Sequence, residues 1–224
     1  IADTMHILTV SINPSLPLEG TGLTFKDVMA LCYCVILAAF TILFGSNREQ
    51  HRGLITAMAF ESLIKVCALC AVGLVAVYGI FGGMEGLDNW LAEHPENLAL
   101  LHTPIRDGSA HTLLLVFVAT AVTMPHIFQM GLAETPLMRN SHIVTWAFPL
   151  FLLLMALPVF PILWAGFELA VPLPAQYFTL GVPILFESPS LTVLAFIGGL
   201  SAATGAMIVI TLALATMVMN HWLL

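Results

Sequence analysis

Two charged residues, Glu61 and Lys65, interrupt an apolar run that is long enough to cross a membrane. They are four residues apart, so on a helix their side chains lie on one face, one turn or about 6 Å apart, with the acid on the favourable N-terminal side. An ionisable residue inside a membrane span is a candidate for ion or substrate binding. The alternative is a self-neutralising pair near the headgroups, in which the lysine stem reaches towards the interface.

A second candidate lies around Pro125, in the middle of another apolar run. Proline removes a backbone hydrogen bond and usually kinks a helix, and a broken helix at membrane depth exposes backbone groups that can bind a solute. His126 and Gln129 are one turn apart at this point. One interpretation is a substrate site formed by Met124, His126, Phe128 and Gln129. The alternative is a kinked span whose histidine bonds to a neighbouring helix.

The third candidate is the small-residue segment 198–206, Gly-Gly-Leu-Ser-Ala-Ala-Thr-Gly-Ala. Small residues let helices approach closely, so packing alone would explain the segment. Ser201 and Thr204, however, are three residues apart on one face and could offer hydroxyl oxygens to a cation. Hard cations need several oxygen ligands, so a second helix would have to complete such a site. Sodium is the one cofactor that this pattern suggests.

The elements that position these residues follow from composition. Of the 224 residues, 59% are hydrophobic and only 8% are charged, whereas soluble domains carry about 25% charged residues. The apolar runs are continuous and do not alternate as barrel strands do, which leaves helices as the spanning form. We predict an all-α, polytopic bundle of transmembrane helices in a lipid bilayer, forming a single domain over residues 1–224. The expected spans are residues 28–45, 53–82, 111–133, 143–167 and 190–219, after the last turns of a helix at residues 1–12.

Long loops are expected at residues 83–110 and 168–189. The short loops 46–52 and 134–142 carry arginines and are predicted to face the cytoplasm, because basic residues of short loops stay inside. The long loops would then face outward.

Composition and motifs also exclude some functions. The net charge of −7 offers no basic surface for nucleic acid. The four cysteines lie in apolar runs, where packing explains them better than metal or redox chemistry. No catalytic triad or nucleotide-binding motif occurs, so we expect no catalytic site in this chain.

Several motifs resemble the sodium/solute symporter family, most of all its branch fused to bacterial sensor histidine kinases. Within residues 45–82, a basic loop with His-Arg-Gly (51–53) precedes a helix that opens Ala-Phe-Glu-Ser-Leu-Ile-Lys (59–65). A Trp-x-Phe-Pro-Leu helix (146–150) and a small-residue helix ending Met-Asn-His-Trp-Leu (219–223) follow in the same order. The likeness covers most of the chain.

The resemblance implies a fragment of the inverted-repeat, leucine-transporter-type fold, cut from a longer protein. The five spans would correspond to core helices four to eight, and the kinked third span to discontinuous helix six, which lines the substrate site. The sodium-ligand pattern of core helix eight falls on Ser201, Thr204 and Gly205. Because a glycine replaces the last hydroxyl, the likeness predicts a weak or absent sodium site. The acidic residue of core helix five falls on Glu61 or Ser62.

The resemblance also implies a role. It suggests a multi-pass protein of the bacterial inner membrane that takes up or senses a small organic solute such as an amino acid. A cytoplasmic kinase domain would belong to the same full-length chain. The alternatives are a symporter without signalling and a structural membrane subunit that binds no ligand.

Overall fold

A computed structural model of the chain describes residues 2–12, 25–45, 51–102, 109–124 and 141–218. Within these ranges the regular structure is helical and contains no strand, which confirms the all-α class. The helices are α1 (Ala2–Ile12), α2 (Phe25–Gly45), α3 (His51–Val75), the π-helix η1 (Ala76–Ile80), α4 (Met84–Glu93), α5 (Pro95–His102), α6 (Ser109–Thr123), α8 (Ser141–Ala156), α9 (Val159–Glu168), the 3₁₀ turn η3 (Ala175–Tyr177), α10 (Phe178–Leu185) and α11 (Pro189–Val218).

Three helical stretches of the described chain are long and apolar enough to cross a membrane. They are Thr56–Ile80, Thr145–Glu168 and Pro189–Ala215, of 25, 24 and 27 residues. At 1.5 Å per residue they extend about 36–40 Å, more than the ~30 Å hydrocarbon core requires. These helices indicate a membrane protein.

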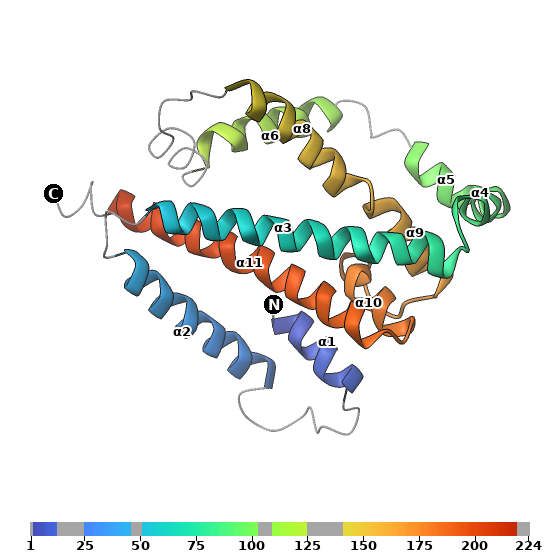
Figure 1. The fold of residues 1–224 in the computed structure, drawn as a ribbon, viewed down its shortest axis with the longest axis horizontal. Helices are drawn as coiled ribbons and strands as arrows, with labels where there is room; N and C mark the ends of the chain where they lie inside the picture. The colour runs from blue at the N-terminus through green and yellow to red at the C-terminus, as the bar shows by residue number, and fades with distance from the viewer. Residues whose placement is uncertain (1, 13–24, 46–50, 103–108, 125–140, 219–224) are drawn as a thin grey trace.

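Helices α3 and α11 lie side by side and run in opposite directions along the length of the molecule (Figure 1). Their close approach depends on small residues: a Cβ atom added to Gly198 would lie 2.5 Å from the Cβ of Ala68. Helix α2 packs on this pair through α11, and α8 packs on it through α3. The pair therefore forms the centre on which the other described helices are placed.

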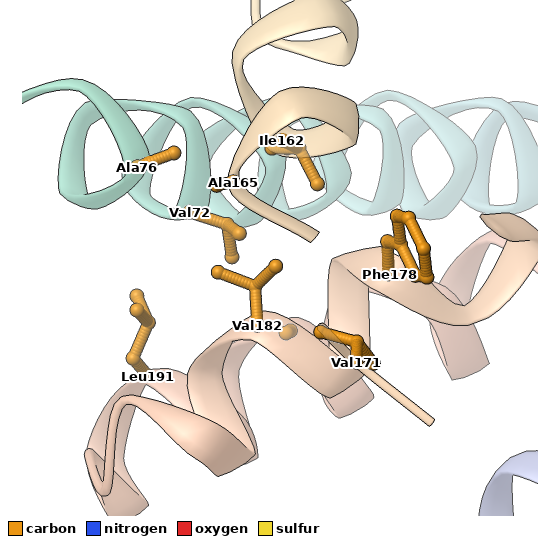
Figure 2. Packing of buried hydrophobic residues seen from close by; sticks show 9 residues of the cluster. Val72, Ala76, Ile162, Ala165, Val171, Phe178, Val182 and Leu191 are labelled. Carbon is orange, nitrogen blue, oxygen red and sulfur yellow. The ribbon is translucent and has the colours of Figure 1, made fainter. Parts of the chain in front are cut away.

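A hydrophobic core lies where α3, α9, α10 and α11 meet (Figure 2). Val72 of α3 and Val182 of α10 are fully buried and point towards each other. Phe178 reaches the same cluster and fills the space beside Gly166, where an added Cβ would overlap its ring. Between membrane helices the gain comes from close packing rather than from exclusion of water, and this packing fixes one end of the α3–α11 pair.

The segments expected to be loops contain helices. Residues 83–110 form α4 and α5 over much of their length, and residues 168–189 contain η3 and α10. The reason is short amphipathic patterns: Leu87 and Trp90, three residues apart, are buried on one side of α4, which is the spacing of a helical face. These helices are too short to span the bilayer, and so a search for long apolar runs misses them.

Two of the long helices are also interrupted. The span predicted at 143–167 breaks at Pro158, which cannot donate a backbone hydrogen bond, and continues as α9. Helix α3 widens into the π-helix η1 and stops at Gly82 and Gly83, whose φ angles of 75° and 123° favour glycine. Both breaks lie at the end of the molecule that carries α4 (Figure 1).

Trp90 joins α4 to the end of α9. Its indole Nε1 donates a hydrogen bond to Oε2 of Glu168. Its ring is tilted against Phe81, with centroids 5.3 Å apart, and stacks on His94 at 4.6 Å. The buried indole thus satisfies its polar group while its ring covers apolar surface.

Replacing Trp90 by phenylalanine is expected to lower the free energy of unfolding by about 1.5–3 kcal/mol, because a hydrogen bond to a charged group is lost. Thermal or denaturant unfolding in detergent measures the change. Glu168→Ala should cost a similar amount, and the double variant no more than either single one. Additive costs would show that the two side chains do not act as a pair.

Candidate solute and ion site

Glu61 and Lys65 form an ion pair on α3. The Lys65 Nζ lies 3.2 Å from the Glu61 Oε1, and the side chains are 25% and 18% exposed for lysine and glutamate. The pair lies within the span-length stretch that begins at Thr56. Helix periodicity places both residues on one face, as expected from their spacing, and this face meets α11.

Gly205 of α11 lies directly against the Glu61 carboxylate. A Cβ atom at position 205 would overlap both carboxylate oxygens. The missing side chain therefore provides the space that Glu61 occupies. A carboxylate oxygen from α3 thus stands close to where the symporter pattern would place a hydroxyl on α11.

Ser201 lies one turn before Gly205 on the same helix. Its Oγ is buried and has no hydrogen-bond partner within the described ranges. Buried hydroxyl groups without a partner are uncommon and call for an explanation such as an ion or water. This oxygen is the observation that best fits an oxygen-liganded cation.

Thr204 has a different environment. Its Oγ1 donates to the Leu200 carbonyl oxygen at 2.7 Å and lies 2.7 Å from the Tyr33 hydroxyl. Because the threonine proton is used on the carbonyl, Tyr33 is the donor in the second bond. The sequence analysis missed Tyr33, although a tyrosine inside an apolar span needs a polar partner, which was a usable signal.

A sodium ion at this place would share the Glu61 carboxylate with the Lys65 ammonium, whose Nζ lies 3.2 Å from Oε1. Its oxygen ligands would come from Glu61 on α3 and Ser201 on α11, while the Thr204 hydroxyl already bonds to the Leu200 carbonyl and to Tyr33. The Lys65 ammonium also lies beside that carboxylate and is its resident counter-ion. The described parts of the chain contain no cluster of three or more His, Cys, Asp or Glu side chains that is placed to hold a metal ion.

A cavity of about 330 Å³ adjoins this site. It lies between α1, α3, α8, α10 and α11, and its wall includes Thr4, Lys65, Met155, Thr179, Phe196 and Gly199. Its floor is the small-residue face of α11, which leaves room between the helices. Lys65 thus belongs both to the ion pair and to the cavity wall.

Of the four predicted substrate residues after α6, the structure describes Met124 alone. Met124 is 39% exposed and is not among the described residues that line it. His126, Phe128 and Gln129 lie outside the described residues. Their role stays a prediction.

Tyr33→Phe is expected to weaken the attachment of α2 to α11 by about 0.6 kcal/mol, the average for interhelical hydrogen bonds in membranes. Thermal unfolding of the variant measures the loss. Tyr78→Phe is the matched control, since the Tyr78 ring is 62% exposed. Equal effects of the two substitutions would contradict a role for the Tyr33–Thr204 bond.

Comparison of the chain with protein-family models, with curated proteins and with solved structures found no match. The likeness to sodium/solute symporters therefore depends on the quoted residues alone. The structure adds two contacts of α11 near the cavity: Gly205 with Glu61 of α3, and Thr204 with Tyr33 of α2.

Proposed function

We propose that this chain is the core of a membrane domain that binds a small organic solute together with sodium, in the manner of a sodium/solute symporter. The observation that carries the proposal is the contact of Glu61 with Gly205 between two span-length helices, beside a cavity and one turn from the buried Ser201 hydroxyl. Glu61 and Gly205 were both singled out by their sequence patterns, and their contact requires the two helices to be oriented correctly.

In this proposal the two helices contribute different parts of the cation site. Helix α3 contributes the charge through Glu61, and α11 contributes the neutral oxygen of Ser201 and the space at Gly205. Neither helix alone offers enough oxygens, so ion affinity depends on how the two are positioned. A rocking movement of one helix group against another, as in alternating access, would change the distance between Glu61 and Ser201. Ion binding would thereby be coupled to the movement.

The proposal also includes the membrane in which the chain lies and the orientation of its loops. We place the chain in the bacterial inner membrane, with residues 46–52 and 134–142 in the cytoplasm. The solute is a small organic molecule, with amino acids as the first class to test. In the full-length protein, a cytoplasmic histidine kinase would receive the signal of solute binding.

The test is uptake of a labelled amino-acid panel by the full-length protein in proteoliposomes, with and without a sodium gradient. The proposal expects sodium-stimulated uptake that falls in Ser201→Ala and Thr204→Ala. Thr211→Ala is the matched control, because Thr211 lies on the same helix, is exposed, and bonds only back to the Met207 carbonyl oxygen at 2.7 Å.

Other outcomes separate the alternatives. Uptake without sodium stimulation would reject the cation site and keep the transport role. Solute-induced stabilisation without uptake would favour a sensor. Neither uptake nor stabilisation by any solute would reject the proposal and favour a structural subunit.

A further inference from the structure

We infer that the solute is a small organic anion, a carboxylate on a compact apolar body, and that Lys65 holds its charge. The inference depends on the proposed function, since it names the class of solute for the cavity beside the ion pair. Among the described residues that line the cavity, Lys65 is the one charged side chain. The wall therefore offers a positive charge and no acidic group to a solute.

Lys65 has donors to spare for such a solute. An ammonium group carries three N–H donors, and the Lys65 Nζ lies 3.2 Å from one carboxylate oxygen, the Oε1 of Glu61. The lysine side chain is 25% exposed, so it is not enclosed by α11. A carboxylate in the cavity would meet an ammonium already held in place by Glu61, and an ordered partner binds with a smaller loss of side-chain entropy.

The remainder of the wall suits an apolar body with a polar end. Leu69, Leu180 and Phe196 provide apolar surface, and Gln176 and Thr179 provide an amide and a hydroxyl. A volume of about 330 Å³ is at the lower end of the ~300–1,000 Å³ usual for ligand sites, which favours a compact molecule. Long-chain or multiply charged anions do not fit this description.

From the position of the ion pair we expect the carboxylate solute and sodium to bind cooperatively. With a carboxylate bound, Lys65 would face two negative groups, one of them Glu61. A cation at Glu61 would neutralise one of the two, so sodium should raise the affinity for the carboxylate. Linkage requires that the carboxylate raise the affinity for sodium by the same factor.

The experiment uses the full-length protein in nanodiscs and two sets of probes matched in shape. They are 3-methylbutanoate, 3-methylbutanamide and 3-methylbutylamine, and phenylacetate, phenylacetamide and 2-phenylethylamine. Thermal shift and calorimetric titration, each in sodium and in choline chloride, measure binding. We expect the carboxylates to raise the Tm and to bind at least ~10-fold more tightly than their amides, as for a hydrogen bond to a charged group.

The decisive variant removes both charges of the pair, because Lys65→Met alone would leave Glu61 without its partner. In Glu61→Gln/Lys65→Met the preference for carboxylate over amide should disappear. Lys26→Met is the control, since Lys26 pairs with Asp3, is half exposed and does not line the cavity. It should keep the preference.

The outcomes distinguish the inference from the function on which it depends. Amides or amines that bind as tightly as the carboxylates would overturn the inference and leave the solute-binding function standing. A preference for carboxylates that survives in the double variant would overturn the role of Lys65. No stabilisation by any probe or by sodium would overturn both the inference and the proposed function.

Discussion

Replacing Gly205 by alanine is expected to reduce sodium binding by about 10- to 100-fold while changing thermal stability little. The added Cβ would occupy the position of the Glu61 carboxylate. A carboxylate is the far end of a flexible side chain, so it can swing aside without moving α3 or α11. It would then be lost as a cation ligand, and a charged interaction of about 1.5–3 kcal/mol corresponds to that change in affinity. Binding of labelled sodium to the purified protein measures it.

Two controls accompany this variant. Gly199→Ala adds the same methyl group to the same helix at a position where nothing lies within 4 Å, and it should leave sodium binding unchanged. Gly198→Ala would instead press on the Ala68 side chain, and should lower stability by about 1–3 kcal/mol through overpacking. If Gly205→Ala binds sodium normally, Glu61 is not a ligand.

The sequence predicted the helical class and the individual candidate residues because these depend on local patterns. Continuous apolar runs identify helices, and a spacing of four places Glu61 and Lys65 on one face whatever surrounds them. The leucine-transporter-type arrangement stays a prediction, since the described helices alone do not test it. The short helices α4 and α10, of 10 and 8 residues, were missed because they are too short to form an apolar run of span length.

The contact between Gly205 and Glu61 could not be predicted from spacing. It depends on the rotation of α3 about its own axis and on its position along that axis relative to α11. Both are set by packing at Gly198 and in the Val72–Val182 core. From sequence, Gly205 indicated only a missing hydroxyl and therefore a weaker sodium site. The structure shows a second role for Gly205, because the absence of a side chain leaves room for the Glu61 carboxylate. Whether the site is weak stays a prediction that sodium binding would test.

Lys65→Met alone is expected to destabilise the protein more than Glu61→Gln/Lys65→Met. The single variant leaves a carboxylate that is only 18% exposed without its counter-ion, and removing one partner of a buried pair costs about 3–5 kcal/mol. Since both groups keep some exposure, we expect the lower part of that range. The double variant replaces the pair by uncharged groups of similar size, which is often neutral.

Denaturant unfolding of the wild type, both single variants and the double variant forms a complete cycle. A pair near the headgroups with Lys65 reaching towards water would give a coupling below about 1 kcal/mol, as for exposed ion pairs. A coupling of about 2 kcal/mol or more would instead place the pair in a low-dielectric environment. In that environment an ionised Glu61 is stabilised by a counter-charge, which is supplied by Lys65 or by a bound cation. Sodium should therefore restore stability to Lys65→Met and leave the double variant unchanged, and the absence of this difference would argue against a cation at Glu61.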